Sequence, residues 1–454
     1  MTSISEIKDE LSSIVGSEHV YHKDHDLTAY TRDISPYRPQ WPDVVALPGN
    51  KEEVSKLLSF ANKNKIPVTC RAGGTSIKGN CIPRNGGIVL DLARMDQVLE
   101  INEDLMTITV QAGCPVFKAE KAAGKKGWRL PLRTMFASGV TAGAWTSTNG
   151  FGLRNSKYGR TIEFTQGIEV VLPTGEIIRT GANAFKNSDP FARYAGIDVT
   201  SLFSGAAGTM GVMTEVTWRI VPIFEGFDCI TFGFNDPKGI VIAATELQRR
   251  ELISTYDIED DDCYKVFLGI DFPDRLVFSL DVENDKEVVP YQMKEARKIC
   301  EEAGGIDRGS SISKFFWDEI VTVSFASSSL GRFLCVDCLN TIQSFPEVYK
   351  VAKDKFAKYN LANGWLGVGI VPNYQITAPT GFYTEPDQWD DCLKAYEEIY
   401  EEWMKIPNVV HSYPSPIFNH FFHEGMRPAE YEFLKRIKHL VDPNNIMNPG
   451  LLPY

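Results

Sequence analysis

Apolar and polar positions along the first third of the chain follow helical and strand periods in turn. Residues 51–61 keep their apolar side chains on one helical face, and Asn50 with Glu53 forms the pattern of an N-terminal capping box. Short β-branched runs follow, and Pro115 precedes another helical pattern. Strands are predicted at 66–70, 87–91 and 106–110, and a second helix at 116–123. Residues 40–125 therefore predict a compact α+β unit.

A hairpin is predicted at 168–179 and a strand at 212–218, and both are joined to glycine-rich segments. The pattern of apolar and polar positions changes after residue 222. Beyond this point, helices alternate with strands in the manner of an α+β domain with antiparallel pairing. These helices are predicted at 240–252, 288–302, 389–404 and 428–441, and the strands near 263–282, 333–339 and 366–371.

Length and composition narrow the class of protein. At 454 residues the chain is expected to form two or three domains, and its 43% hydrophobic and 23% charged content is that of a globular protein. A net charge of -12 argues against nucleic acid or an anionic membrane as a partner. The polar N-terminus and the lack of a long apolar run predict a cytoplasmic protein without membrane insertion. Nine scattered cysteines fit a reducing compartment, and Cys335 and Cys338 are interpreted as inert thiols.

The segment from Arg71 to Asn80 follows a predicted strand and carries the most informative local chemistry. Three glycines and the hydroxyls of Thr75 and Ser76 stand where the backbone must bend. Such a loop can turn successive N–H groups into a nest for an anion, and a pyrophosphate is the natural ligand. An ordinary glycine-rich turn is the alternative, because isolated glycine motifs are common.

Three further segments accompany this loop. Two are glycine clusters, at 137–159 and 205–211, which allow a flat ligand to approach the backbone closely. The third is the tail at 442–450, where two prolines and Asn-rich turns predict a fixed, irregular segment.

Together these segments resemble the FAD-linked oxidases of the vanillyl-alcohol oxidase superfamily, and most closely their glycolate oxidase and D-lactate dehydrogenase branch. Residues 71–79 are similar to the RGGGTSxxG loop of that family, 202–215 to its LFxGSEGTLGIITE segment and 442–450 to its DPNNILNPG tail. The resemblance implies an α+β fold of the p-cresol methylhydroxylase type. It comprises a two-subdomain FAD-binding domain (1–222), an α+β cap or substrate domain with an antiparallel sheet (223–410), and a C-terminal segment (411–454) that returns to the FAD-binding domain.

The resemblance also implies which residues hold FAD. The first loop and the start of the second cluster would bind the pyrophosphate, and the remaining residues would lie near the flavin ring. Because the first loop offers Thr75 and Ser76 where many relatives have histidine or cysteine, we expect non-covalent FAD. The predicted cofactor-binding residues are Arg71, Ala72, Gly73, Gly74, Thr75, Ser76, Gly79, Asn80, Ser138, Gly139, Thr141, Gly143, Asn149, Gly150, Tyr158, Gly208, Gly211, Val212 and Asn448.

On the substrate side the chain departs from the hydroxy-acid branch. Residues 367–376 contain no histidine where that branch has HxGDGNxH, and residues 317–320 lack the arginine of its WxxR. We predict His420 or His423 as the base that takes the hydroxyl proton, although a solvated histidine pair fits equally well, and Tyr374 as a further catalytic residue. HxxHE lacks a further ligand, so no metal site is predicted. Guanidinium donors for an anionic substrate would be Arg133, Arg332 and Arg427, each of which is also consistent with a plain surface arginine.

The leading hypothesis is an FAD-dependent oxidoreductase that acts on a CH–OH group of a small 2-hydroxy acid of the D-lactate or glycolate type. Electrons would pass to a separate acceptor protein, an electron-transfer flavoprotein or an iron–sulfur subunit, because no NAD motif or iron–sulfur cysteine cluster is present. Two alternatives stay open: oxidation of a phenolic or other alcohol, and a catalytically degenerate FAD-binding subunit. For assembly, a homodimer is one option, and the sequence does not decide the oligomeric state.

Overall fold

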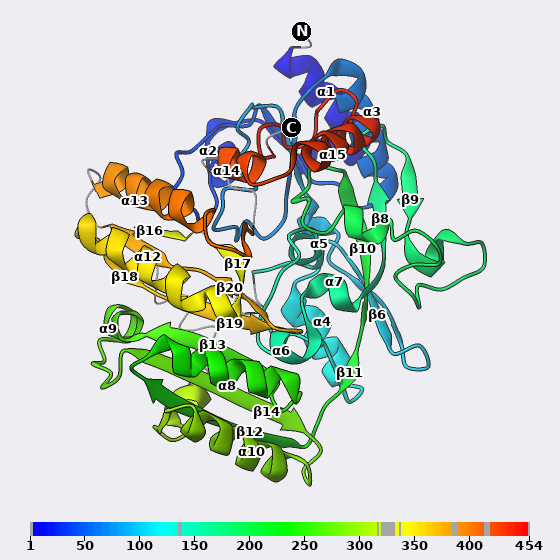
Figure 1. Ribbon diagram of the computed structural model, residues 1–454. Coiled ribbons are helices and arrows are strands. Elements are labelled where there is room, and N and C mark those ends of the chain that lie inside the picture. The colour runs from blue at the N-terminus through cyan, green and yellow to red at the C-terminus, as the bar shows by residue number, and fades with distance from the viewer. Residues whose placement is uncertain are drawn as a thin grey trace. The chain divides into compact units, whose positions relative to one another are not determined.

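The computed structural model describes residues 3–134, 139–315, 317–318, 332–335, 337–383, 388–412 and 418–452 (Figure 1). The chain forms two compact units. Unit 1 comprises residues 1–150, 161–222 and 414–454, and unit 2 comprises residues 151–160 and 223–413. The short segment 151–160 therefore leaves unit 1 and belongs to unit 2. Among the described residues, no helix combines the length and apolar character needed to cross a bilayer.

The first sheet of unit 1 carries the strand that leads into the first glycine loop. Its order is β1-β2-β4-β3, with β2, β4 and β3 parallel and β1 antiparallel at the edge. Helix α3 begins as predicted, because the Asn50 side chain accepts a hydrogen bond from the Glu53 N–H at 2.9 Å. The elements are α1 (Ile4–Val15), β1 (Val20–Tyr21), α2 (Asp24–Leu27), β2 (Val44–Ala46), α3 (Lys51–Asn64), β3 (Val68–Arg71) and β4 (Ile88–Asp91).

The second sheet of unit 1 is antiparallel, in the order β5-β6-β10-β8-β9. Its core contains three aromatic rings, and the Trp145 and Trp218 rings meet edge to face with centroids 5.6 Å apart. The elements are β5 (Val98–Asn102), β6 (Thr107–Gln111), α4 (Val116–Gly124), α5 (Ala142–Ser147), α7 (Thr161–Phe164), β8 (Thr165–Val171), β9 (Ile177–Arg179) and β10 (Val212–Arg219); β7 (Trp128–Arg129) pairs with β11 (Val221–Pro222).

The C-terminal segment returns to the first sheet of unit 1. After α14 (Asn419–Glu424) and α15 (Pro428–Val441), the Val68 N–H donates to the Ile446 carbonyl oxygen at 2.7 Å. The Asn448 N–H donates back to the Val68 carbonyl oxygen, also at 2.7 Å. This parallel bridge joins the tail to the free edge of β3.

Unit 2 is built on an eight-stranded sheet in the order β15-β12-β14-β13-β19-β20-β17-β22, and every neighbouring pair is antiparallel. The predicted antiparallel sheet is therefore confirmed. Its strands are β12 (Gly226–Phe234), β13 (Thr255–Asp260), β14 (Leu276–Asn284), β15 (Ile306–Asp307), β17 (Cys338–Thr341), β19 (Leu366–Ile370), β20 (Tyr374–Thr377) and β22 (Val409–His411); a second sheet contains β16 (Arg332–Cys335), β18 (Ala362–Gly364) and β21 (Thr380–Tyr383).

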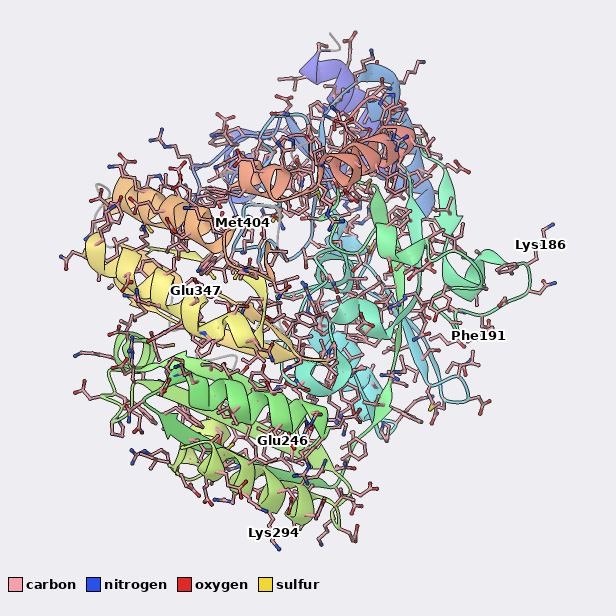
Figure 2. All side chains as sticks on the ribbon, in the orientation of Figure 1. Lys186, Phe191, Glu246, Lys294, Glu347 and Met404 are labelled. Atoms are coloured by element: carbon pink, nitrogen blue, oxygen red, sulfur yellow. The ribbon has the colours of Figure 1, made fainter. Side chains whose placement is uncertain are left out.

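Amphipathic helices supply the apolar core of unit 2. Helices α8 and α10 lie side by side against the sheet, with Glu246 and Lys294 on their outer sides (Figure 2). Helix α8 buries Ile240, Ala243 and Leu247. The helices of this unit are α6 (Asn155–Tyr158), α8 (Pro237–Arg249), α9 (Asp261–Leu268), α10 (Val289–Glu302), α12 (Phe345–Lys358) and α13 (Gln388–Trp403).

The strand predicted near 263–282 is wrong in its first part. Residues 261–268 form helix α9, and the strand starts only at Leu276. Asp260 caps this helix by accepting a hydrogen bond from the Cys263 N–H at 2.9 Å, and two more aspartates occupy its first turn. The chain before the helix is strand β13, which the apolar pattern did not predict.

Candidate functional site

The loop after β3 bends where the sequence predicts an anion nest. Gly74 and Gly79 have φ angles of +63° and +76°, a left-handed backbone that glycine adopts at little cost. The Ser76 Oγ accepts hydrogen bonds from the Lys78 N–H at 3.1 Å and from the Asn80 N–H at 3.3 Å. Ser76 therefore fixes the curvature of the loop from within.

The first and second glycine clusters meet directly. A Cβ atom added to Gly73 would lie 1.7 Å from the Gly139 carbonyl oxygen, and one added to Gly139 would lie 2.8 Å from the Thr75 Cγ2. Neither position can carry a side chain without moving the other segment. The two segments predicted to bind one pyrophosphate are therefore brought together.

A junction of hydrogen bonds joins the tail to the first loop and to the third cluster. The buried Asn448 side chain donates from Nδ2 to the Asn80 carbonyl oxygen at 2.7 Å and to the Ala207 carbonyl oxygen at 3.4 Å. Ala207 has a φ of +48°, and Gly208 follows at +77°. Asn448 thus holds two loops at once, a structural role beyond the predicted place near the flavin ring.

A buried ion pair between Lys438 and Asp442 adjoins this junction. The Lys438 Nζ donates to the Thr209 carbonyl oxygen at 2.7 Å, to the Asp442 Oδ2 at 2.5 Å and to the Met447 carbonyl oxygen at 3.4 Å. Asp442 also accepts the N–H groups of Ile446 and Met447, at 3.0 and 2.9 Å. Lys438 and Asp442, which are 5% and 1% exposed, therefore tie helix α15, the tail and the third cluster into one network.

Three buried polar atoms near these loops have no hydrogen-bond partner among the described residues. They are Oδ1 of Asn80, Nη1 of Arg84, whose Nη2 donates to the Gly79 carbonyl oxygen, and Oγ1 of Thr141, which stands at the N-terminus of α5 without capping it. Buried polar atoms nearly always have a partner in a native protein. Together with the close backbone approach at Gly73 and Gly139, the Thr141 hydroxyl fits a bound dinucleotide pyrophosphate, because it can donate to a phosphate oxygen. Asn80 Oδ1 only accepts, so its partner would have to be a donor, such as a ribose hydroxyl of the same dinucleotide. Sequence reasoning passed over Lys78, a buried lysine of the same loop, although its place among the glycines was a signal.

Arg71 positions the loop through the segment before it. Its guanidinium donates to the carbonyl oxygens of Arg32 and Ala29, at 2.8 and 3.1 Å, and lies 5.5 Å from the Tyr30 ring centroid. The Tyr30 hydroxyl in turn donates to the Asp91 Oδ2 at 2.9 Å, at the end of β4. The side chain of Arg71 is therefore engaged in binding the segment 29–32.

The thiols beside the loop are poorly suited to a covalent flavin bond. Cys70 lies in β3 near Gly208, and Cys81 follows Asn80. Burial raises the pKa of both thiols to about 12. Because the thiolate is the reactive form, this environment supports the prediction of non-covalent FAD.

The residues predicted to line the flavin ring lie at constrained points of unit 1. A Cβ added to Gly150 would lie 2.0 Å from the Trp145 Cδ1, and one added to Gly211 would lie 2.8 Å from the Val171 carbonyl oxygen. Asn149 has a φ of +46° and accepts the Ile162 N–H at 3.2 Å. Gly143 packs against β6, Val212 begins β10, Tyr158 belongs to α6 of unit 2, and Ser138 lies outside the described residues.

The predicted catalytic residues occur on both units. His420 and His423 lie on α14, as the helical spacing requires, and both are exposed. The His423 ring contacts the Tyr431 ring, with centroids 4.1 Å apart. Tyr374 starts β20 of unit 2, where it pairs with Thr341 and Ile370. Their roles stay predictions, as do those of Arg133, Arg427 and Arg332, whose side chain lies outside the described set.

One face of the unit 2 sheet carries buried acidic side chains that the sequence analysis did not select. The buried side chains are Glu259 on β13 and Asp281 and Glu283 on β14, and the half-buried Asp257 lies on the same face as Glu259, with Thr255 opposite Asp281. Desolvation by burial raises the pKa of Asp257 to about 7 and those of Glu259 and Asp281 well above their usual values. Burial therefore favours the neutral acid form of Glu259 and Asp281 over the carboxylate.

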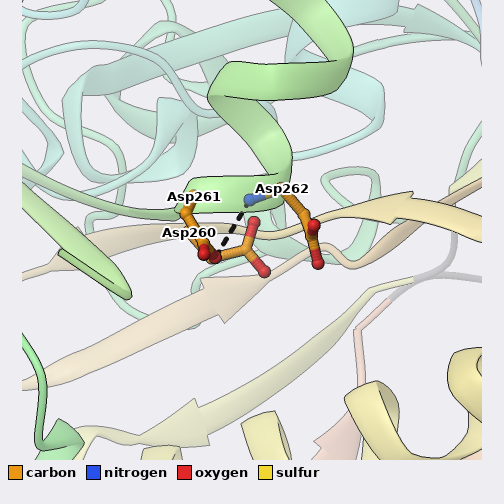
Figure 3. A group of neighbouring side chains, drawn as sticks. All are labelled: Asp260, Asp261 and Asp262. Carbon is orange, nitrogen blue, oxygen red and sulfur yellow. Dashed lines mark hydrogen bonds between the residues drawn. The ribbon is translucent and has the colours of Figure 1, made fainter. Parts of the chain in front are cut away.

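A second acidic group lies at the start of α9. Asp260, Asp261 and Asp262 form the one cluster among the described residues whose oxygens are close enough to share an ion (Figure 3). The Lys353 Nζ already donates to the Asp260 Oδ2 at 2.8 Å, to the Asp262 Oδ2 at 2.5 Å and to the Asn363 Oδ1 at 2.6 Å. A lysine thus supplies the cation for this cluster.

Comparison with known proteins gives matches at both ends of unit 1. The FAD binding domain profile matches residues 42–181, and the profile of the C-terminal domain of FAD linked oxidases matches residues 419–452. The chain is 26% identical to glycolate oxidase subunit GlcD of Bacillus subtilis, over 98% of this chain and 96% of the relative. It is 26% identical to a D-lactate dehydrogenase of Archaeoglobus fulgidus over 90% of both chains, and 23% identical to a D-2-hydroxyglutarate dehydrogenase of Stutzerimonas stutzeri over 97% of both.

Solved structures agree on the architecture. Substrate-bound p-cresol methylhydroxylase superposes with a TM-score of 0.88 at 17% identity, over 98% of this chain and 96% of that one. The isoeugenol complex of 4-ethylphenol oxidase from Gulosibacter chungangensis gives 0.86 at 18% identity, with the same coverage. At such identities the likeness concerns the fold, and it confirms the predicted p-cresol methylhydroxylase type.

Proposed function

We propose that this chain, which matches an FAD binding domain and the C-terminal domain of FAD linked oxidases, oxidises a small 2-hydroxy acid to the 2-oxo acid. The reaction removes a hydride from the carbon atom and a proton from the hydroxyl oxygen. Bound FAD would supply the hydride acceptor, and a separate acceptor protein would take up the two electrons. The enzyme is therefore proposed to be a dehydrogenase of the D-lactate or glycolate type.

The observation that carries the substrate class is similarity along nearly the whole chain. The relatives at 26% identity include a glycolate oxidase subunit and a D-lactate dehydrogenase, and the matches cover at least 90% of both chains. These matches extend over unit 2, whereas similarity of the FAD-binding domain alone would be confined to unit 1. Shared descent over both units supports a shared kind of substrate.

Unit 1 would bind the cofactor through its three glycine clusters. The N–H groups around Gly74 and the hydroxyls of Thr75 and Thr141 would donate to the pyrophosphate, and Oδ1 of Asn80 would accept from a donor elsewhere on the dinucleotide. Asn448 holds two of these loops in register through its side-chain amide. The chain thus organises the cofactor mainly through backbone groups fixed by packing.

The proton acceptor is proposed to be His420 or His423. An imidazole near neutral pH is suited to this task, and α14 presents both side chains to solvent in the present structure. The double variant His420→Ala/His423→Ala should reduce the rate of flavin reduction by about 100-fold or more. An unchanged rate would remove both residues from the mechanism.

The proposed function can be tested on the purified holoenzyme by anaerobic mixing. Loss of the visible flavin absorbance with D-lactate, glycolate or D-2-hydroxyglutarate supports the proposal. Loss with substituted phenols alone supports a phenol oxidoreductase, an alternative favoured by the lack of histidine in residues 367–376. Retention of the absorbance with every compound, with FAD present, supports an accessory flavoprotein subunit.

The separate acceptor has its own test. After reduction, rapid reoxidation by an artificial one- or two-electron dye with slow reoxidation by air is expected for a dehydrogenase. Rapid reoxidation by air would show that oxygen itself is the acceptor.

A further inference from the structure

Arg154 is a buried cation of unit 2 held in one orientation. Its guanidinium donates from Nε to the Glu283 Oε2 at 2.5 Å and from Nη2 to the Glu283 Oε1 at 3.3 Å. Its backbone N–H donates to the Thr255 Oγ1 at 2.8 Å, and its φ is +74°, in the left-handed region. The Trp317 ring lies under the guanidinium, with its centroid 5.1 Å from Cζ. An arginine so placed is preorganised to bind a further acceptor.

Two polar atoms beside this arginine lack partners among the described residues. One is its own Nη1, a donor, and the other is Oδ1 of Asp281, and the two residues are 6% and 5% exposed. Asp281 lies two residues before Glu283 on β14, hence on the same face, and it stands opposite Thr255. Arg154 contacts Glu283 and Thr255, so the two unpaired atoms belong to one neighbourhood. A small ligand that carries both an anionic acceptor and a hydroxyl group would satisfy them together.

The charges around these atoms admit an anion. Glu283 balances the charge of Arg154, and burial raises the pKa of Asp281 well above its usual value, which favours its neutral form. Asp257, an acidic neighbour on the same face of the sheet, has a pKa raised to about 7. A carboxylate at Nη1 would therefore meet a guanidinium beside acids whose burial favours the neutral form.

We propose that Arg154 and Asp281 bind the 2-hydroxy acid, with Arg154 Nη1 donating to the carboxylate and Asp281 Oδ1 hydrogen-bonding to the hydroxyl group. This inference rests on the proposed function and names two residues that select its substrate. A 2-hydroxy acid carries both groups on adjacent carbon atoms. A phenol or a neutral alcohol leaves Nη1 without an acceptor, which a buried site penalises.

The first test uses oxalate, a planar carboxylate without an oxidisable C–H bond, titrated against the flavin spectrum of the holoenzyme. The variant Arg154→Lys should raise the Kd of oxalate by about 10- to 100-fold, the range expected when a hydrogen bond to a charged group is lost. Arg308→Lys is the matched control, because Arg308 makes a similar bidentate pair with Asp274, at 2.7 and 2.9 Å, in the same unit. The control should change the Kd by less than about twofold.

The second test uses Asp281→Val, which keeps a branched side chain suited to β14 and removes the acceptor. This variant should raise the Kd of D-lactate, from the concentration dependence of flavin reduction, by about 3- to 10-fold, and leave that of oxalate within about twofold. The wild-type enzyme should bind D-lactate at least about tenfold more tightly than neutral D-lactamide. This comparison does not depend on the folding of any variant.

The outcomes separate this inference from the function on which it rests. If D-lactate or glycolate reduces the wild-type flavin, but Arg154→Lys binds oxalate as tightly as Arg308→Lys does, the role of Arg154 is refuted and the function stands. Equal binding of D-lactate and D-lactamide also refutes it. If no hydroxy acid reduces the flavin and oxalate does not bind, the proposed function and the inference fall together.

Discussion

Replacement of Lys438 by methionine should loosen the junction of the cofactor loops. The change keeps the length of the side chain but removes the ammonium that donates to Thr209, Asp442 and Met447. It leaves the Asp442 carboxylate, only 1% exposed, without its cation and the Thr209 carbonyl without its donor. The third glycine cluster and the tail then lose the group that joins them to α15.

The magnitude follows from the burial of the pair. Breaking a buried ion pair by removing one partner costs about 3 to 5 kcal/mol, because the remaining charge stays uncompensated. For a unit of about 250 residues, each kcal/mol lowers the melting temperature by about 2 °C. The variant should therefore melt about 6 to 10 °C lower, and it should release FAD before the rest of the protein unfolds.

Two thermal scans test this expectation: the rise of flavin fluorescence on FAD release, and the loss of circular dichroism. The control is Lys435→Met on the same helix, whose pair with Glu432 is 3.8 Å long and mostly exposed, so a shift under about 1 °C is expected. If Lys438→Met melts within about 2 °C of the wild type and keeps its FAD, the network does not hold the loops together. Restoration of stability by Lys438→Met/Asp442→Asn would identify the uncompensated carboxylate as the cause.

Gly73→Ala would place a methyl group 1.7 Å from a carbonyl oxygen, so the purified variant should contain little FAD by its flavin-to-protein absorbance ratio, whereas Gly124→Ala, which meets nothing within 4 Å, should keep it. Burial raises the pKa of Asp257 from 3.8 to about 7, so the folded protein binds more protons than the unfolded chain between these values. The free energy of unfolding should therefore fall as the pH rises from about 4 to about 7, and urea titrations should show a smaller fall for Asp257→Asn. Because Cys70 and Cys81 stay protonated thiols, all FAD should pass an ultrafilter after acid denaturation, and flavin retained on the chain would contradict this.

The local pattern of apolar and polar residues was sufficient to predict many helices and strands of the fold. Helix α15 has the predicted bounds, because its apolar period is regular and Pro428 stands in its first turn. Strand β13 was not predicted, although Tyr256 and Ile258 alternate with Asp257 and Glu259 in the two-residue period of a strand, because three acidic residues within six positions indicate an exposed segment. Their burial is decided by the neighbouring strands and helices, which local propensity does not include.

The same division applies to the site. The glycine loops can be recognised in the sequence. A backbone that closely approaches a ligand or another chain segment has no room for a side chain, so glycines cluster there. The contacts of Arg154 with Glu283 and of Lys438 with Thr209 join residues that are 129 and 229 positions apart. Arg154 lies within the second glycine cluster and Lys438 within an amphipathic helix, but neither pattern distinguishes these side chains from their neighbours, so only the three-dimensional structure could select them.

The bridge between Val68 and Met447 has a consequence for biosynthesis. The ribosome makes Val68 about 380 residues before its partner, which is roughly 20 to 75 s at 5 to 20 residues per second. Throughout that interval β3 has an open edge, and the loop that follows it lacks the amide of Asn448. Flavin loading should accordingly occur after translation has passed Asn448, so nascent chains arrested before that point should not retain FAD.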